Sequence, residues 1–461
     1  MSLTPKIKKF SLVSLLSTLL LTGCQYLPTF SSPASAPVKS YHAVETHNFP
    51  LDYEQNLIGT LAAIKTQNND TLPDIARHFG LGHNDIISAN PTIDPWLPEP
   101  DTQVLLPLLF TLPDAPRQGI VLNLANMRLF YFPNQPSERV VTYPVGIGRD
   151  GWNTPLGLTR IISKTKNPTW NVPPSIQREH AEKGDPLPSS IPSGPNNPLG
   201  EYAMRLARSS YLIHGTNKPY GVGMQMSHGC LNLYPEDISA LFNSTRVGTA
   251  VMIVDQPYLL GWHQDTLFLE AHKPLQADKN FKGPLLEQIK QLAKKQKLRI
   301  DWPKVEQVLQ LANGIPTPIL AGSMSLQELS ANALLLQHPE HFYEQPRPSA
   351  LTTNDWSVTA ATLTDDRTAR KLAVLLNHQG PAIPARTIQQ DQVFHVIAGP
   401  FANSKEANTA LKRIRLEFEL NGKINPPQAS SGRKSLPPTL RKPPRLEDPP
   451  RETAFFENWI N

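Results

Sequence analysis

Short apolar runs separated by turn residues dominate the middle of this 461-residue sequence and predict a β-rich domain. The runs are rich in β-branched and aromatic residues, which favour strands over helices. They lie at 120–124, 129–132, 140–143, 161–162, 211–213 and 251–254. We therefore predict a β-rich domain over residues 117–255.

Helical spacing of apolar residues flanks this domain on both sides. Before it, residues 61–108 predict a strand, helix, helix, strand module, whose first helix is capped at Asn69-Asp70-Thr71 and whose second starts at Asn84 or Asp85. After it, residues 256–350 predict a strand pair that continues the sheet, followed by helices near 284–298 and 305–311.

An internal repeat follows the helical extension. Residues 357–363 and 395–401 have matching strand character 38 positions apart, and each is followed by a polar turn and an amphipathic helix. The two helices are expected to end at Gly380 and Gly422. Two such strand, helix, strand units predict a ferredoxin-like α+β domain over residues 354–427.

Composition adds the organisation of the whole chain. Its length suggests about two to four domains, and 47 prolines against 25 glycines favour stiff spacers between them. We assign residues 25–60 to a linker and residues 428–461 to a Pro-rich disordered tail. The net charge of +5 is too diffuse to indicate nucleic acid as a partner, and two cysteines exclude a disulfide scaffold and a Cys-based zinc site.

The first cysteine ends a predicted signal peptide over residues 1–24. Three lysines precede an apolar stretch at 10–21, which is too short to span a membrane. Leu21-Thr22-Gly23-Cys24 resembles the bacterial lipobox, which implies that Cys24 is lipidated and is the only membrane anchor. Gln25 stands where retention at the inner membrane usually requires Asp, so we expect attachment to the outer membrane, facing the periplasm. The alternative is an ordinary secretory signal with an incidental cysteine.

The second cysteine has the surroundings of a nucleophile. Cys230 follows Ser227-His228-Gly229, and His214 lies sixteen residues before it at the end of a predicted strand. An imidazole can accept the thiol proton, and the helix start at 235–237 would favour the thiolate. A buried structural cysteine is the alternative, but an unpaired reactive thiol in a secreted protein is otherwise a liability.

This region resembles the L,D-transpeptidase (YkuD-type) catalytic domain. The resemblance is carried by Gly146-Ile147-Gly148, Thr154-Pro155-Leu156-Gly157, Gly200-Glu201-Tyr202-Ala203 and the segment 214–237. It implies a β-sandwich with the site in a cleft under a flap, which residues 168–198 would supply as a Pro-rich loop without helix. It also implies attack by Cys230 on the bond between the third and fourth residues of a peptidoglycan stem, followed by transfer of the acyl group to an amine.

The resemblance assigns roles to named residues. His214 would be the general base and later the acid, with the Gly215 carbonyl orienting its ring. Backbone N–H groups around His228, Gly229 and Cys230 would bind the oxyanion. Four side chains are expected to line the site, each with structural support as the alternative: Tyr202, Ser227, His228 and Asn232. No cofactor and no metal is required.

Two flanking modules resemble wall-binding domains. Asn69-Asp70-Thr71-Leu72, Ile75-Ala76 and Asn90-Pro91 resemble the LysM glycan-binding module, with a small helical cap lacking a ligand as the alternative. Ala398-Gly399-Pro400-Phe401 resembles the SPOR domain, with an unrelated ferredoxin-like fold as the alternative. These resemblances imply peptidoglycan as the partner, through both stem peptides and glycan strands.

The function predicted is an L,D-transpeptidase that remodels or cross-links the cell wall. The same thioester can go to water, so a hydrolase that releases wall-bound lipoprotein is one alternative. A non-catalytic scaffold lipoprotein is the other, although the intact His214 and Cys230 motifs favour the enzyme. The sequence leaves the acceptor open among a neighbouring stem, an outer-membrane lipoprotein and a free D-amino acid.

Overall fold

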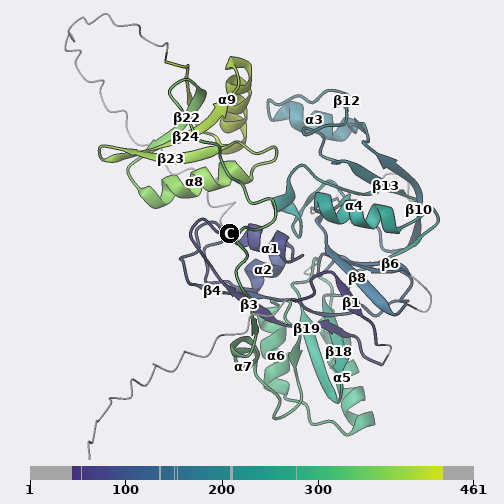
Figure 1. The fold of residues 1–461 in the computed structure, drawn as a ribbon. Coiled ribbons are helices and arrows are strands. Elements are labelled where there is room, and N and C mark those ends of the chain that lie inside the picture. The colour runs from purple at the N-terminus through teal and green to yellow at the C-terminus, as the bar shows by residue number, and fades with distance from the viewer. Residues whose placement is uncertain are drawn as a thin grey trace, which may run out of the picture. The chain divides into compact units, whose positions relative to one another are not determined.

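A nine-stranded sheet is the largest element of the structure, a computed structural model that describes residues 44–428 except 53, 134–136, 150, 153, 208–210 and 277 (Figure 1). The predicted signal peptide with Cys24, most of the linker and all but the first residue of the tail lie outside the described residues. In sheet order the strands are β1 (Asn48–Pro50), β8 (Arg139–Pro144), β7 (Arg128–Phe132), β6 (Gly119–Asn123), β17 (Ala250–Val254), β10 (Gly157–Lys166), β13 (Tyr202–Leu206), β14 (Leu212–His214) and β16 (Leu231–Asn232).

The sheet curls at β10 because the two halves of this strand pair with different neighbours. Residues 157–160 pair with β17, residues 161–166 pair with β13, and the register shifts between Ile161 and Ser163. A bulge of this kind bends a strand and increases its twist. Instead of the predicted two-sheet sandwich, the catalytic region therefore has one curled sheet, with helix α4 (Pro235–Ser244) packed on its inner face.

The first module has the predicted order of strand, helix, helix, strand. Its elements are β3 (Ala62–Lys65), α1 (Leu72–His78), α2 (His83–Ala89) and β4 (Gln103–Leu106). Thr71 caps α1 by accepting a hydrogen bond from the Asp74 N–H, and Asn69 has φ +69°, which Asn tolerates in a turn. Capping and turn residues in the sequence therefore predicted the ends of these helices and strands to within about one residue.

This module shares a hydrophobic core with the sheet. Phe130 and Val140 of the sheet lie in one buried cluster with Ile64, Leu72 and Ile75 of the module. The segment before it also joins the fold, because β1 extends the large sheet and β2 (Leu57–Gly59) pairs with β5 (Leu109–Thr111). The prediction of a linker up to residue 60 is therefore wrong for residues 48–50 and 57–59, whose strands are too short to show a periodic pattern.

The extension after the sheet forms a separate unit, contrary to the prediction that it continues the sheet. Strands β18 (Tyr258–His263), β19 (Thr266–Ala271) and β20 (Thr317–Pro318) make a three-stranded sheet that packs on α5 (Lys282–Gln296) and α6 (Trp302–Leu311). After α7 (Leu326–Ala331), strand β21 (Leu334–Leu335) pairs in parallel with β3. His338 then hydrogen-bonds Asp70 at 2.9 Å and Phe342 is buried against Phe79, so this segment is anchored to the first module.

The C-terminal domain has the predicted ferredoxin-like topology. Its elements are β22 (Trp356–Leu363), α8 (Asp366–His378), β23 (Ala385–Gln390), β24 (Val393–Phe401), α9 (Ser404–Phe418) and β25 (Lys423–Asn425). The antiparallel order β23-β24-β22-β25 places the two β-α-β units side by side, and both helices bury their apolar stripes in one core cluster. Helix α9 ends at Phe418 with Glu419 in the left-handed conformation, before the predicted stop at Gly422.

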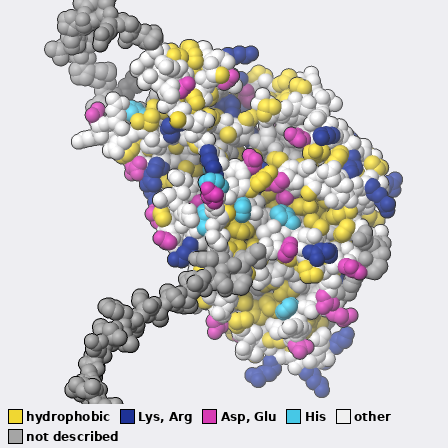
Figure 2. All heavy atoms as spheres, viewed as in Figure 1, with side chains coloured by type: hydrophobic (Ala, Val, Ile, Leu, Met, Phe, Trp, Pro, Cys, Tyr) yellow, Lys and Arg dark blue, Asp and Glu magenta, His cyan; other side chains and the backbone are white. Residues whose placement is uncertain are grey.

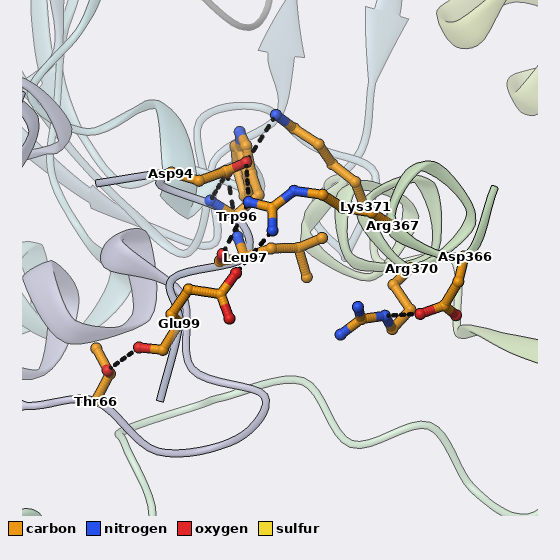
Figure 3. Close-up of polar contacts among 9 residues, drawn as sticks. All are labelled: Thr66, Asp94, Trp96, Leu97, Glu99, Asp366, Arg367, Arg370 and Lys371. Carbon is orange, nitrogen blue, oxygen red and sulfur yellow. Dashed lines mark hydrogen bonds and ion pairs between the residues drawn. The ribbon is translucent and has the colours of Figure 1, made fainter. Parts of the chain in front are cut away.

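Ion pairs connect α8 to the loop between α2 and β4 (Figure 3). Arg367 lies 2.8 Å from Glu99 and 3.2 Å from Asp94, which also lies 3.4 Å from Lys371. Because Arg367 and Glu99 are largely exposed, that pair contributes less than about 1 kcal/mol. Figure 2 shows Lys and Arg interspersed with Asp and Glu over the face drawn, in keeping with the diffuse net charge.

No helix within the described part of the chain is both long and apolar enough to cross a membrane.

A buried ion pair joins the first module to the large sheet. Arg128 on β7 is 1% exposed and donates to Asp85 on α2 at 2.7 Å, to the Gly80 carbonyl at 3.2 Å and to Thr142 at 3.4 Å. Its guanidinium also lies 4.1 Å from the centre of the Phe110 ring. The charge is therefore paired and hydrogen-bonded where water cannot reach it.

We predict that Arg128→Met lowers the free energy of unfolding by about 3–5 kcal/mol, because it leaves Asp85 without its buried partner. Guanidinium denaturation followed by tryptophan fluorescence measures the change. Lys282→Ala is the control, since its pair with Glu306 is half exposed and its loss should cost less than about 1 kcal/mol. Equal effects of the two variants would contradict the role of Arg128.

Candidate active site

The parallel pairing of β14 with β16 places His214 at the end of one strand and Cys230 directly before the start of the other. Ile213 is opposite Leu231 in this pair, and both side chains are fully buried in the core on one face of the sheet. Since side chains alternate along a strand, His214 and Cys230 belong to the other face. The Leu212 backbone N–H donates a hydrogen bond to the Cys230 sulfur, which holds the thiol beside β14.

The His214 ring is oriented by the Gly215 carbonyl, as the sequence predicted. Nδ1 lies 2.5 Å from this oxygen, so Nδ1 carries the proton and Nε2 keeps its lone pair. Burial lowers the pKa of His214 to about 4, and the contact with Gly215 only partly offsets that effect. The imidazole is therefore neutral at pH 7 and able to accept a proton.

Burial disfavours the thiolate form of Cys230, whereas the sequence predicted that a nearby helix start would favour it. Burial raises its pKa, and the Leu212 N–H and the charge of Arg205 offset this only in part. The first turn of α4 does not supply the missing stabilisation, because it carries Glu236 and Asp237 close to its positive end. The site thus holds a neutral thiol and a neutral imidazole.

The loop that carries Cys230 is held by hydrogen bonds at two carbonyls. The Ser227 hydroxyl donates to the Cys230 carbonyl at 2.5 Å, and the Thr154 hydroxyl donates to the Gly229 carbonyl at 3.0 Å. Outside the strand ladders, the backbone N–H groups of His228, Gly229 and Cys230 have no backbone acceptor among the described residues. Such groups are suited to bind a developing oxyanion.

Gly229 has a backbone conformation and close neighbours that a residue with a side chain would not tolerate. Its φ is +95°, and a Cβ at this position would lie 3.2 Å from both the Trp152 carbonyl oxygen and a ring carbon of Tyr211. The absence of a side chain at Gly229 therefore lets the Cys230 loop pack tightly against Trp152, in the segment before β10.

His228 faces the flap. Its Nε2 lies 3.0 Å from Glu179 Oε2 on α3 (Pro174–Glu182), and its ring contacts Trp152 edge to face with centroids 5.0 Å apart. The flap was expected to be a loop, but α3 lies between the short strands β11 (Trp170–Asn171) and β12 (Ser190–Ile191). The prolines that suggested a loop at this point occupy the helix start, where proline is well tolerated.

Asn232 lies beside His214 in the sheet, whereas the Tyr202 side chain lies on the opposite face. Ala203 is opposite His214, so Tyr202 points to the opposite face, where its ring contacts Phe242 at 4.8 Å. The prediction that the Tyr202 side chain lines the site is therefore wrong, although its carbonyl accepts the Gly215 N–H. Asn232 is opposite His214 in β16, bridges to Gly146 through its backbone, and has a buried Oδ1 with no partner among the described residues.

Four residues near the site were missed by the sequence analysis: Arg149, Trp152, Glu179 and Arg205. Arg149 directly follows the Gly146-Ile147-Gly148 motif and Trp152 lies three residues further on, so their position near this motif was an available signal. Arg205 faces the site by the same alternation that places Ala203 there. No sequence pattern indicated Glu179, because the helix that carries it was not predicted.

The sequence matches two protein families whose positions agree with these structural units. The L,D-transpeptidase catalytic domain (YkuD) matches residues 117–253, and the SPOR domain matches residues 352–423. These matches bear out the predicted catalytic and C-terminal domains. They do not cover the first module, whose similarity to LysM stays a prediction.

Curated relatives extend the similarity beyond the catalytic domain. The chain is 34% identical over 315 residues to the probable L,D-transpeptidase ErfK/SrfK of Escherichia coli K12, which covers 66% of this chain and 97% of that protein. It is 35% identical over 289 residues to the probable L,D-transpeptidase YbiS of the same strain, covering 61% and 94%. The chain therefore belongs to the L,D-transpeptidase family, and the predicted enzyme class is confirmed.

We predict that alkylation of Cys230 has a midpoint above the ordinary thiol pKa, because burial disfavours the thiolate. Alkylation by iodoacetamide between pH 4 and 10, with mass spectrometry of the Cys230 peptide, measures the midpoint. The same peptide in urea-unfolded protein is the reference. A rate that is already maximal between pH 5 and 8 would instead indicate a thiolate–imidazolium pair.

We predict that Gly229→Ala lowers kcat/KM at least about 10-fold, because alanine at φ +95° is strained and meets Trp152 and Tyr211. Gly248→Ala is the matched control. Its φ is +94° with open space around the added Cβ, so it should lose stability without losing activity. Equal kcat/KM for the two variants would show that the Cys230 loop tolerates the change.

Proposed function

We propose that this L,D-transpeptidase acts on peptidoglycan stem tetrapeptides through an acyl-enzyme on Cys230. The supporting observation is the arrangement of His214 and Cys230 on one face of paired strands, with Nδ1 of the histidine committed to Gly215. This leaves Nε2 as the atom that accepts the thiol proton. The scissile bond joins the third residue, an L-centre of diaminopimelate, to the fourth, D-Ala.

The reaction starts from a neutral Cys230 thiol and a neutral His214 imidazole. The Cys230 proton moves to His214 Nε2 as sulfur attacks the carbonyl, because neither the free thiolate nor the imidazolium is favoured in this buried site. When the tetrahedral intermediate collapses, the C–N bond breaks and D-Ala leaves with the proton from His214. An incoming amine then attacks the thioester, loses its proton to His214, and the new amide releases Cys230 as the thiol.

Charge on the carbonyl oxygen is stabilised by the Cys230 loop. The N–H groups of His228, Gly229 and Cys230 are the donors, and each donor in acyl transfer typically contributes about 3–4 kcal/mol to the transition state. The hydrogen bonds from Ser227 and Thr154 to the loop carbonyls hold these donors in place. In this proposal Ser227 acts by positioning the loop, while Asn232 borders the site beside His214.

The remaining parts of the chain place the enzyme at the wall. The SPOR domain binds glycan strands, the LysM-like module at 61–108 adds a second glycan contact, and lipid on Cys24 attaches the chain to the outer membrane in the periplasm. Support comes from the SPOR family match, the observed helix and strand order of the first module and the lipobox sequence. Peptidoglycan is then the partner of all three folded parts.

We predict that the wild type releases D-Ala from a tetrapeptide-bearing muropeptide and forms a new linkage at the third residue when an amine is present. Cys230→Ala should abolish both products, and His214→Gln should lower kcat at least about 100-fold because the proton acceptor is lost. His263→Ala, at an exposed histidine outside the site, is the control. Liquid chromatography with mass spectrometry identifies the products.

The outcomes separate three functions. D-Ala release without a linkage, whatever amine is offered, would indicate a hydrolase. No release, combined with sedimentation of the protein with sacculi, would indicate a scaffold. A diaminopimelate-containing stem, a lysine peptide from a lipoprotein and a free D-amino acid are offered separately, so the productive amine identifies the acceptor class.

A further inference from the structure

A carboxylate from the flap is bound at the edge of the active site. Glu179 Oε2 lies 2.6 Å from Arg149 Nη2 and 3.0 Å from His228 Nε2, and Oε1 accepts a hydrogen bond from Lys183 at 2.9 Å. Arg149 and His228 belong to the catalytic region, whereas Glu179 and Lys183 belong to the flap. Arg149 Nη2 and His228 Nε2 thus both lie within hydrogen-bond distance of one oxygen of the α3 carboxylate, and they lie 3.0 Å from each other.

The two donors are held in position by the backbone of the Cys230 loop. The Arg149 N–H donates to the Ser227 carbonyl at 2.8 Å, where β9 (Ile147–Gly148) pairs with β15 (Gln225–Ser227). A Cβ on Gly148 would lie 2.9 Å from the Gly229 Cα, so the two segments are in direct contact. His228 is two residues from Cys230, and Trp152 packs against its ring.

We propose that Arg149 and His228 bind the free α-carboxylate of the substrate's terminal D-residue, and that Glu179 occupies this site until substrate displaces it. The proposal rests on the proposed function, in which the residue that leaves carries a free carboxylate one carbon from the scissile nitrogen. A carboxylate-binding site next to the nucleophile therefore suits the leaving residue. An arginine can bind such a group through two parallel hydrogen bonds.

Exposure of the cluster makes the exchange feasible. The side chains of Arg149, Glu179 and His228 are between 23% and 35% exposed, so water screens their interaction. A partly solvated ion pair of this kind can be exchanged for an equivalent pair with a competing carboxylate of the same charge. The flap helix would then be released from the catalytic region when the substrate enters.

The site would also select for the length of the stem peptide. A stem extended by one residue has an amide where the tetrapeptide has its terminal carboxylate, and an amide cannot form the charged hydrogen bonds that Arg149 offers. Discrimination between these substrates would therefore depend on Arg149 and not on the nucleophile.

We predict that wild-type kcat/KM falls about 10- to 100-fold when the tetrapeptide terminus is changed from carboxylate to carboxamide. Arg149→Ala should lower kcat/KM for the acid substrate by a similar factor, mainly through KM, and leave the amide substrate nearly unchanged. Glu179→Gln should lower KM for the acid substrate, because the internal competitor loses its charge. Release of the terminal residue, measured by mass spectrometry in the full-length protein, gives all these values.

Arg178→Ala is the matched control, since it removes an exposed arginine next to Glu179 on the same helix. If Arg149→Ala lowers kcat/KM equally for both substrates, the arginine only supports the loop and the inference is wrong. A higher KM for the acid substrate in Glu179→Gln would likewise overturn the role of Glu179. Inactivity of the wild type on both substrates would instead contradict the proposed function itself.

Discussion

The parallel pairing of β14 with the two-residue strand β16 is the constraint on which the site depends. It is very short, yet it sets which face His214 and Cys230 share and how far apart they lie along the sheet. Ile213 and Leu231 anchor it by filling the core behind it. A shift of one residue would turn either side chain to the opposite face, so the register itself is part of the catalytic machinery.

Burial then determines the protonation states within that arrangement. Desolvation disfavours charge on both groups, which lowers the pKa of His214 and raises that of Cys230. The two effects together keep the pair neutral, whereas an exposed pair of the same residues would be closer to forming an ion pair. A neutral thiol is also less easily oxidised, which suits a cysteine in an oxidising compartment.

The sequence predicted the parts of the site that depend on local chemistry. The positions of His214 and Cys230 and the contact of the His214 ring with the Gly215 carbonyl were implied by motifs that resemble those of a known family. Tyr202 was misplaced because β13 was not recognised as a strand, so the alternation of its side chains could not be assigned. The flap helix was missed because the prolines and polar residues of the segment 168–198 were taken to indicate a loop, although Pro173 and Pro174 lie at the start of the helix.

The anchoring of residues 334–342 to the first module limits how far the SPOR domain can travel. His338 and Phe342 hold this segment to the catalytic body, and β22 begins at Trp356. Residues 343–355 then connect this segment to the domain and span at most about 45 Å when fully extended. The domain also contacts the rest of the chain through His378, which lies 3.0 Å from Asp74, and through Trp96 and Tyr220, which are buried in its core cluster. A glycan strand bound by this domain therefore stays within reach of the same enzyme molecule.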